Sequence, residues 1–317
     1  MSRKGKILCI LASVLLAVFL LGAFLQERDR QRAQAEAVAA VIAEAAVYEA
    51  ELAEIEDALA EMAAAIPYTL ETTQILIAFE LSDPADLTYF QSQAEKYGFS
   101  PILVLDCTET LPTLLSCLDA AGETGWEIML FADSFSETVN ENVLSVREAL
   151  TSRGMADTGV FLLRMDSASE QNIQTLIDDG FLGYTIYSEN PTAGYTGEGI
   201  FYFDYSYMRT PNETINSRLS LAYANKCPML VLFEMESVGN GALPESYVVS
   251  VLELAATFAG YADAEFSTVA QVLSSLETMR QIEAQRQSAY DAYAALQQSR
   301  IDALTARIAE IQSKLAE

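Results

Sequence analysis

Residues 74–106, QILIAFELSDPADLTYFQSQAEKYGFSPILVLD, decide the fold class of this chain. They begin with an apolar run (Gln74–Leu81), continue into a helical pattern (Asp86–Gly98), and end with a second apolar run (Pro101–Asp106). Near-continuous apolar strands joined by a helix are typical of a parallel sheet that is covered on both faces. The stretch is therefore predicted to form a strand–helix–strand unit.

The same alternation continues along the chain to about residue 267. Further strands are predicted at Glu127–Asp133, Gly159–Met165, Gly183–Ser188, Gly199–Tyr205 and Cys227–Met235. Helices are predicted at Leu111–Ala121, Glu141–Arg153, Glu170–Gly180, Glu213–Asn225 and Glu245–Tyr261. This repetition predicts an α/β fold, either a (β/α) barrel or a doubly wound sheet. In both architectures the ligand site lies at the C-terminal ends of the strands.

Charged side chains stand at these predicted strand ends. The candidates for ligand binding are Glu80, Asp83, Asp106, Asp133, Arg164, Asp204 and Glu234. Carboxylate oxygens alone can hold Ca²⁺ or Mg²⁺, and paired carboxylates can run a glycosidase-type reaction. In a chain with 45 acidic residues, however, carboxylates occur at most loop starts. We therefore predict neither a metal site nor a cofactor, and interpret a nearby tyrosine-rich stretch (residues 184–207) as ordinary strand packing.

Composition excludes several classes of function. The net charge of -27 disfavours nucleic-acid binding, because such a surface repels phosphates. The chain contains no histidine, which excludes a Ser-His-Asp triad and every metal site that uses a histidine ligand. The cysteines form no CxxC pair, so a thiolate zinc site is not expected. Cys107 and Cys117 either form a disulfide in an oxidising compartment or remain buried thiols.

The N-terminus carries a long apolar run, Ile7–Leu25, with the sequence ILCILASVLLAVFLLGAFL. It is long enough to cross a bilayer as a helix. Arg3, Lys4 and Lys6 precede it, which predicts a cytoplasmic N-terminus and an extracytoplasmic remainder at the cell membrane. A cleaved signal peptide is the alternative, and the poor small-residue match at residues 21–23 disfavours it. We expect a cytoplasmic tail at residues 1–6 and an uncleaved anchor at residues 7–25.

Two helical segments flank the predicted α/β domain of residues 67–267. Residues 26–66 and 268–317 contain neither glycine nor proline, and their apolar residues alternate at spacings of three and four. This spacing is a heptad seam and predicts coiled-coil helices. The two helices can pair with each other as an intramolecular antiparallel stalk, or each can pair with a second subunit.

The order of segments resembles the polysaccharide deacetylase superfamily over roughly residues 73–277. Ile77–Pro84 lies where the family has its first strand and a T-F-D-D-G-P motif, and Lys96–Phe99 leads to the second strand as it does in the family. Gly125–Ile128 is similar to the family's approach to the third strand, and Asp179–Phe181 to the turn before the fifth. Leu230–Phe233 lies at the family's leucine-histidine motif. The resemblance implies a distorted (β/α)7 barrel.

The resemblance also assigns family positions to residues of this chain. In the family, one Asp and two His hold a divalent metal that activates a water, while a second Asp acts as base. Glu80 stands at the base position, and Leu81 replaces the metal-binding Asp. Phe131 and Phe135 replace the two metal-binding histidines, and Phe233 replaces the histidine that acts as acid. Apolar side chains neither bind a divalent ion nor move a proton, so the resemblance implies no metal-dependent deacetylation. The same phenylalanines can also simply fill the barrel mouth as core.

Three functional hypotheses follow. The first is a membrane-anchored pseudo-deacetylase domain on a coiled-coil stalk, which binds cell-envelope glycan or an envelope protein. The second is an active deacetylase or other glycan hydrolase with a carboxylate-only site at which Glu80 takes part. The third is a scaffold whose helices bind a partner and whose barrel is a spacer. The sequence favours the first.

Overall fold

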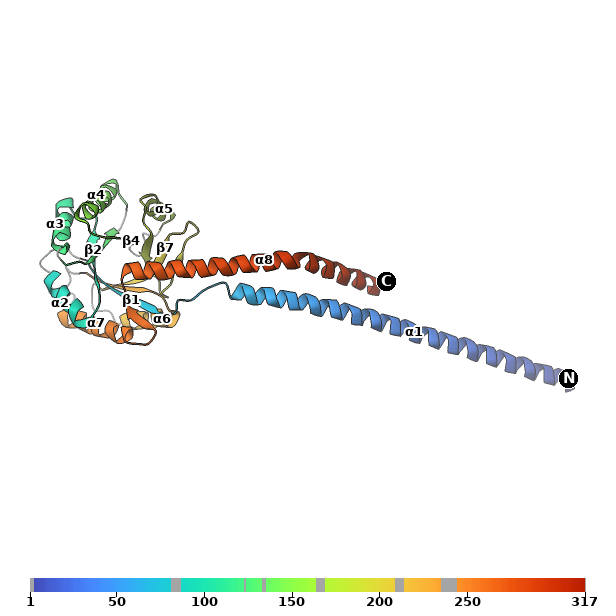
Figure 1. The fold of residues 1–317 in the computed structure, drawn as a ribbon. Coiled ribbons are helices and arrows are strands. Elements are labelled where there is room, and N and C mark those ends of the chain that lie inside the picture. Colours follow the sequence, from blue (N-terminus) through green and yellow to red (C-terminus); the bar gives the residue numbers. More distant parts are fainter. Residues whose placement is uncertain are drawn as a thin grey trace. The chain divides into compact units, whose positions relative to one another are not determined.

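The computed structural model describes residues 3–80, 87–122, 124–132, 135–163, 169–208, 214–234 and 244–316, with side chains from Val18 onward (Figure 1). The chain divides into two compact units. One consists of Pro67–Ala284, and the other consists of Met1–Ile66 together with Gln285–Glu317. The first unit begins where the α/β domain was predicted to begin, but it extends beyond residue 267.

The secondary structure follows the predicted alternation closely. The strands are β1 (Thr73–Glu80), β2 (Pro101–Asp106), β3 (Glu127–Ala132), β4 (Asp157–Leu163), β5 (Gly183–Ile186), β6 (Ala193–Tyr195), β7 (Phe201–Met208), β8 (Met229–Glu234) and β9 (Ala264–Phe266). The helices are α1 (Arg3–Ala64), α2 (Leu87–Tyr97), α3 (Leu111–Ala121), α4 (Glu137–Arg153), α5 (Glu170–Asp178), α6 (Thr214–Asn225), α7 (Glu245–Ala259) and α8 (Val269–Ala316).

Seven of the strands form a closed parallel barrel. The ring runs β1–β2–β3–β4–β5–β7–β8 and returns to β1, because β1 pairs with both β2 and β8. Closure removes the open edges that a doubly wound sheet keeps. This observation decides between the two architectures that the sequence left open, and confirms the (β/α)7 barrel.

Two short strands were not predicted. β6 pairs antiparallel with β7, and β9 pairs parallel with the first residues of β1. Each has only three residues, too few to display the alternation of apolar and polar side chains from which a strand is predicted. β9 pairs with the first three residues of β1, and β1 pairs with β2 only from Ile77 onward.

The barrel wall separates two hydrophobic cores. Side chains that point inward form one core, which includes Leu76, Val104, Phe131 and Leu232. Their neighbours in sequence point outward and form the other, which includes Leu103 and Phe233 and is covered by the helices. This division follows from the period of two along a strand. It also decides which side chain at each strand end can face the mouth of the barrel.

The first turns of α8 belong to the inner core. Val269, Val272, Leu276 and Met279 pack with the inward-facing strand residues. Glu127, the first residue of β3, accepts a hydrogen bond from the backbone N–H of Val269 at 3.0 Å and so caps the N-terminus of α8. This packing explains why the barrel unit continues to Ala284 rather than ending at residue 267.

In the second unit, α1 and the C-terminal part of α8 run antiparallel. Arg286, Arg300 and Arg307 of α8 contact the Ala65 carbonyl, Glu51 and Glu44 of α1, in reversed order along the chain. The interval between the two glutamates equals that between Arg300 and Arg307. Apolar residues predicted on the heptad seam are buried here, among them Ala45, Ile55, Leu304, Ile308 and Ile311.

The predicted membrane anchor is not confirmed. In the part of the chain that the structure describes, no helix has a stretch that is both long and apolar enough to cross a membrane. Ile7–Leu25 is helical as part of α1, but the side chains of residues 7–17 lie outside the described residues. The described end of this stretch, from Val18 to Leu25, exposes large apolar side chains.

The cysteines of the barrel unit are free thiols. Cys107 and Cys117 are both buried and form no disulfide. Burial raises the pKa of the Cys107 thiol to about 12, so this side chain stays protonated. The sequence left open whether Cys107 and Cys117 form a disulfide or remain buried thiols, and in the structure they are buried thiols.

Candidate functional site

Three polar side chains meet at the C-terminal end of the barrel. Glu80 and Glu234 end the adjacent strands β1 and β8, where they are paired in register. Tyr207 of β7 lies between their carboxylates. Its hydroxyl is 2.7 Å from Glu80 Oε2 and 2.9 Å from Glu234 Oε1. The contact joins residues far apart in sequence and brings together two of the predicted ligand-binding residues.

The two carboxylates compete for the hydrogen bond of one O–H group, that of Tyr207. A phenol carries a single O–H, so Tyr207 can donate a full hydrogen bond to only one oxygen at a time. Burial, and then the negative charge of Glu80, raise the pKa of Tyr207 well above its usual range. The phenol therefore stays neutral and remains a donor. Glu234 is buried, which makes the loss of its proton-donating partner costly.

Asp106 ends β2, and its position along the strand has the same inward parity as Val104. Its Oδ1 accepts hydrogen bonds from the backbone N–H of Thr108 at 2.9 Å and from the Thr108 hydroxyl at 2.7 Å. This arrangement is a local turn in which the carboxylate fixes the start of the following loop. Asp106 thus has a structural role at the rim of the mouth.

Asp204 does not join the mouth, contrary to the sequence-based expectation. It points outward from β7, between the inward-facing Phe203 and Tyr205, and is fully buried. There it forms an ion pair with Arg218 of α6 and accepts a hydrogen bond from the Ser188 hydroxyl. Burial raises the pKa of Asp204, against the lowering effect of Ser188 and Arg218. The prediction was wrong because it considered how near Asp204 lies to the end of its strand, but not which face of the strand its side chain is on.

Arg218 is held by several further partners. Its Nη2 donates to the Tyr205 carbonyl at 2.8 Å, its Nε to the Ser206 hydroxyl, and its guanidinium lies 4.2 Å from the centre of the Tyr187 ring. A buried charge with this many contacts binds the strand wall to α6. The sequence analysis did not identify Arg218 as a buried residue, because nothing in the sequence of its helix distinguishes it from a surface arginine.

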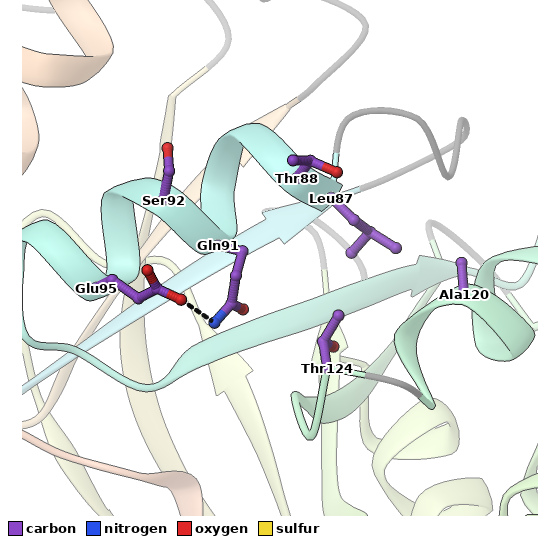
Figure 2. A pocket seen from close by; sticks show the side chains of 7 residues that line it. All are labelled: Leu87, Thr88, Gln91, Ser92, Glu95, Ala120 and Thr124. Carbon is purple, nitrogen blue, oxygen red and sulfur yellow. Dashed lines mark hydrogen bonds between the residues drawn. The ribbon is translucent and has the colours of Figure 1, made fainter.

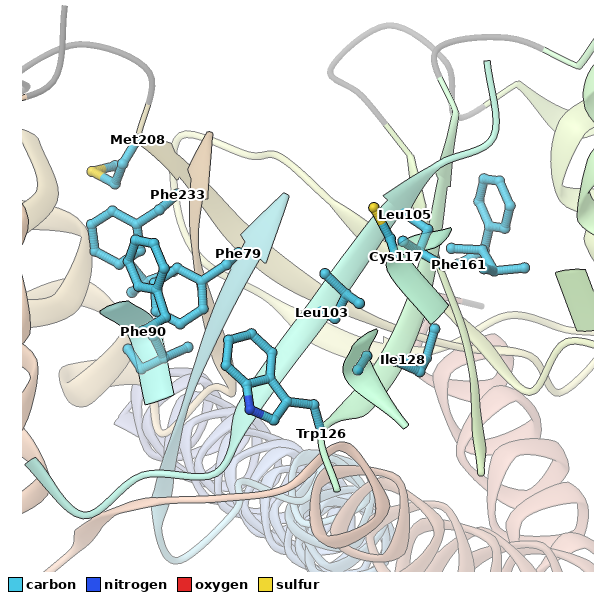
Figure 3. Close-up of a cluster of buried hydrophobic side chains, with 14 of the residues drawn as sticks. Phe79, Phe90, Leu103, Leu105, Cys117, Trp126, Ile128, Phe161, Met208 and Phe233 are labelled. Carbon is cyan, nitrogen blue, oxygen red and sulfur yellow. The ribbon is translucent and has the colours of Figure 1, made fainter. Parts of the chain in front are cut away.

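The three phenylalanines that the resemblance places at histidine positions are hydrophobic core. Phe131 points inward and is 1% exposed. Phe233 points outward and stacks on Phe79, with ring centres 5.5 Å apart (Figure 3). Phe135 packs against Phe161 of the outer core at 5.2 Å. Since they lie on different faces of the wall, they do not converge on one ion.

Phe131, Phe135 and Phe233 therefore supply no ligand for the metal that the family holds. Within the described ranges, no group of three His, Cys, Asp or Glu side chains is placed to hold an ion. Leu81, Asp83, Asp133 and Arg164 lie outside the described residues. Tyr207 was not predicted as a site residue, although it lies two residues after Tyr205, the last residue of a predicted strand, and this spacing was a usable signal for the same facing.

Comparison with known proteins gives matches to solved structures alone. No protein-family model matches the chain, and no curated protein matches its sequence. The solved structures that it matches include proteins described as polysaccharide or peptidoglycan deacetylases.

Three of these structures illustrate the likeness. One, from Mycobacterium smegmatis and assigned as a polysaccharide deacetylase, is 12% identical with a TM-score of 0.46, covering 68% of this chain and 95% of that one. The peptidoglycan deacetylase PdaC from Bacillus subtilis is 10% identical with a TM-score of 0.39, covering 68% and 97%. The Xyl-CE4 domain of a xylanase from a Trinervitermes trinervoides hindgut metagenome is 14% identical with a TM-score of 0.37, covering 64% and 90%. At such identities the likeness concerns the fold and not the reaction.

Proposed function

We propose that this protein is a membrane-anchored, extracytoplasmic domain that binds cell-envelope glycan at the mouth of its barrel, without metal-dependent deacetylation. The observation that carries the proposal is the position of Tyr207 between Glu80 and Glu234. Carboxylates accept hydrogen bonds from sugar hydroxyls, and a neutral phenol can both donate and accept. The mouth thus offers polar groups that suit an uncharged, hydroxyl-rich ligand.

The sequence supports a binding role over the family's chemistry. The chain has no histidine, and Phe131, Phe135 and Phe233 are packed among apolar side chains. The positions that the resemblance assigns to the family's histidines are therefore filled by core side chains, which supports this part of the proposal. What remains at the mouth is a hydrogen-bonding site.

The rest of the chain supports attachment to a membrane. Arg3, Lys4 and Lys6 precede the apolar run Ile7–Leu25, the pattern of an anchor with a cytoplasmic N-terminus. The antiparallel contacts of α1 with α8 support a coiled-coil stalk made by one chain. Labelling of a Ser288→Cys variant on intact cells with a membrane-impermeant maleimide, against the parent chain, tests the topology. Labelling only after lysis contradicts it.

Calorimetry with the full chain in detergent tests glycan binding, using chitin oligomers and soluble peptidoglycan fragments. Tyr207→Phe removes one hydroxyl and should weaken binding about tenfold, the effect of one lost hydrogen bond. Tyr261→Phe is the matched control, because Tyr261 is 45% exposed and is not among the residues at the mouth. Absence of binding to every glycan, or equal affinity in Tyr207→Phe, contradicts the proposal.

A carboxylate-only hydrolase is the second candidate. It is favoured by the position of Glu80 and Glu234 on either side of the Tyr207 hydroxyl, since glycoside hydrolysis uses two neighbouring carboxyl groups, one as acid and the other as base or nucleophile. Acetate or reducing-sugar release from the same glycans, with a bell-shaped pH profile and loss in Glu80→Gln, would establish this activity. No release across the pH range eliminates it.

A further inference from the structure

A second cavity lies outside the barrel wall, between α2 and the turn that follows α3 (Figure 2). Its volume is about 440 Å³, within the range of small-molecule pockets. Leu87 and Ala120 form apolar parts of the lining. Gln91, Ser92, Glu95 and Thr124 contribute polar groups. No residue at the barrel mouth takes part in it.

The orientation of the Gln91 amide is determined by Trp126. The indole N–H is a donor only, and it lies 2.7 Å from Gln91 Oε1. The amide nitrogen must therefore be the other atom, and it donates to Glu95 Oε1 at 3.2 Å, as the dashed line in Figure 2 shows. This order leaves the second N–H of Gln91 and the Oε2 atom of Glu95 without a partner among the described residues.

Two hydroxyls of the lining are fixed as acceptors. Ser92 Oγ donates its proton to the Tyr89 carbonyl at 2.6 Å, and Thr124 Oγ1 donates to the Ala121 carbonyl at 2.7 Å. Because each proton is used within the protein, each oxygen offers only lone pairs to a ligand. The cavity thus presents several acceptors, and its donors are the Gln91 amide and the hydroxyl of Thr88, which also belongs to the lining.

We propose that this cavity is a saccharide-binding site, separate from the barrel mouth. Each hydroxyl of a sugar both donates and accepts, so two neighbouring hydroxyls match the adjacent Gln91 N–H and Glu95 carboxylate. The remaining hydroxyls find acceptors in Ser92 and Thr124, and C–H groups of the ring meet Leu87 and Ala120. Among the described residues of the lining, Glu95 is the one charged group, which favours a neutral sugar over an anionic one.

Trp126 gives this site its own spectroscopic signal. It is the one tryptophan of the chain, and its N–H is bonded to a residue of the cavity lining. A ligand that contacts Gln91 changes the surroundings of the indole, whereas a ligand at the barrel mouth does not touch this network. Tryptophan emission of the full chain in detergent can therefore be titrated with cellotriose and with tri-N-acetylchitotriose.

We expect a saturable change in emission with at least one of these trisaccharides. Glu95→Gln preserves shape but removes the charged acceptor, and should raise the dissociation constant about tenfold or more. Glu141→Gln is the matched control, an exposed position on α4 away from the cavity, and should leave the titration unchanged.

Three results would overturn the proposal: no saturable change with either sugar, the same dissociation constant in Glu95→Gln, or loss of the signal in Tyr207→Phe. The last would mean that the sugar binds at the mouth and reaches Trp126 indirectly. Conversely, an intact emission titration in a Tyr207→Phe variant that has lost calorimetric binding at the mouth supports this site and separates it from the proposed function.

Discussion

Replacement of Phe233 tests whether this residue belongs to the core rather than to a site. Its side chain is fully buried and stacks on Phe79, which in turn contacts Phe90 at 3.8 Å between ring centres. Phe233→Ala leaves a cavity in this aromatic cluster, and such a change costs about 3–5 kcal/mol of the free energy of unfolding. For a domain of this size the melting temperature should fall by roughly 10 °C.

Denaturant unfolding of the full chain measures this cost. Trp126 reports it directly, because its ring lies 5.9 Å from that of Phe79. Leu144→Ala is the control, since Leu144 is 55% exposed on α4 and its removal should change stability by less than about 0.5 kcal/mol. A cost below about 1 kcal/mol for Phe233→Ala would refute the burial of this side chain in the aromatic cluster.

Three further predictions concern charge. Asp204→Asn should lower the free energy of unfolding by about 3–5 kcal/mol, because it leaves Arg218 buried without its countercharge. The double variant with Asp204→Leu and Arg218→Met should lower it far less, and equal losses in denaturant unfolding contradict this account. Burial raises the pKa of Glu127 in the folded state above its ordinary value of 4.5, so the folded state binds the proton more tightly than the unfolded state does. The free energy of unfolding should therefore fall as the pH rises from 4.5 through the folded-state pKa. Denaturant unfolding at a series of pH values should show a smaller fall in Glu127→Gln, and an equal fall in both proteins counts against this account. Tyr207→Phe removes the hydroxyl that donates to Glu80 and Glu234, and should lower the free energy of unfolding by about 1 kcal/mol or more; unchanged stability is incompatible with the site.

Much of the fold was predictable because it depends on local pattern. The strand from Pro101 to Asp106 and the helix from Leu111 to Ala121 were placed at their observed bounds. Long apolar runs and amphipathic helices carry their periodicity in a single stretch of chain. β9 was missed because it is three residues long and exists through its pairing with β1.

The site was less predictable, since its members come from distant strands. Glu80 and Glu234 were proposed from their positions at strand ends, and both reach the mouth. Asp204 was proposed in the same way, and it points outward. A difference of one residue exchanges the two faces of a strand, so a position near the end of a strand does not determine what the side chain meets.

The sequence by itself determined the alternation of strands and helices, the absence of histidine chemistry, and the heptad segments at each end. These are properties of composition and of short-range period, which need no knowledge of contacts. Only the tertiary structure decided that the sheet closes into a barrel, that Tyr207 lies between Glu80 and Glu234, and that Arg218 neutralises Asp204 inside the wall. These depend on the register and the facing of strands far apart in the chain, which side-chain packing selects when the barrel forms.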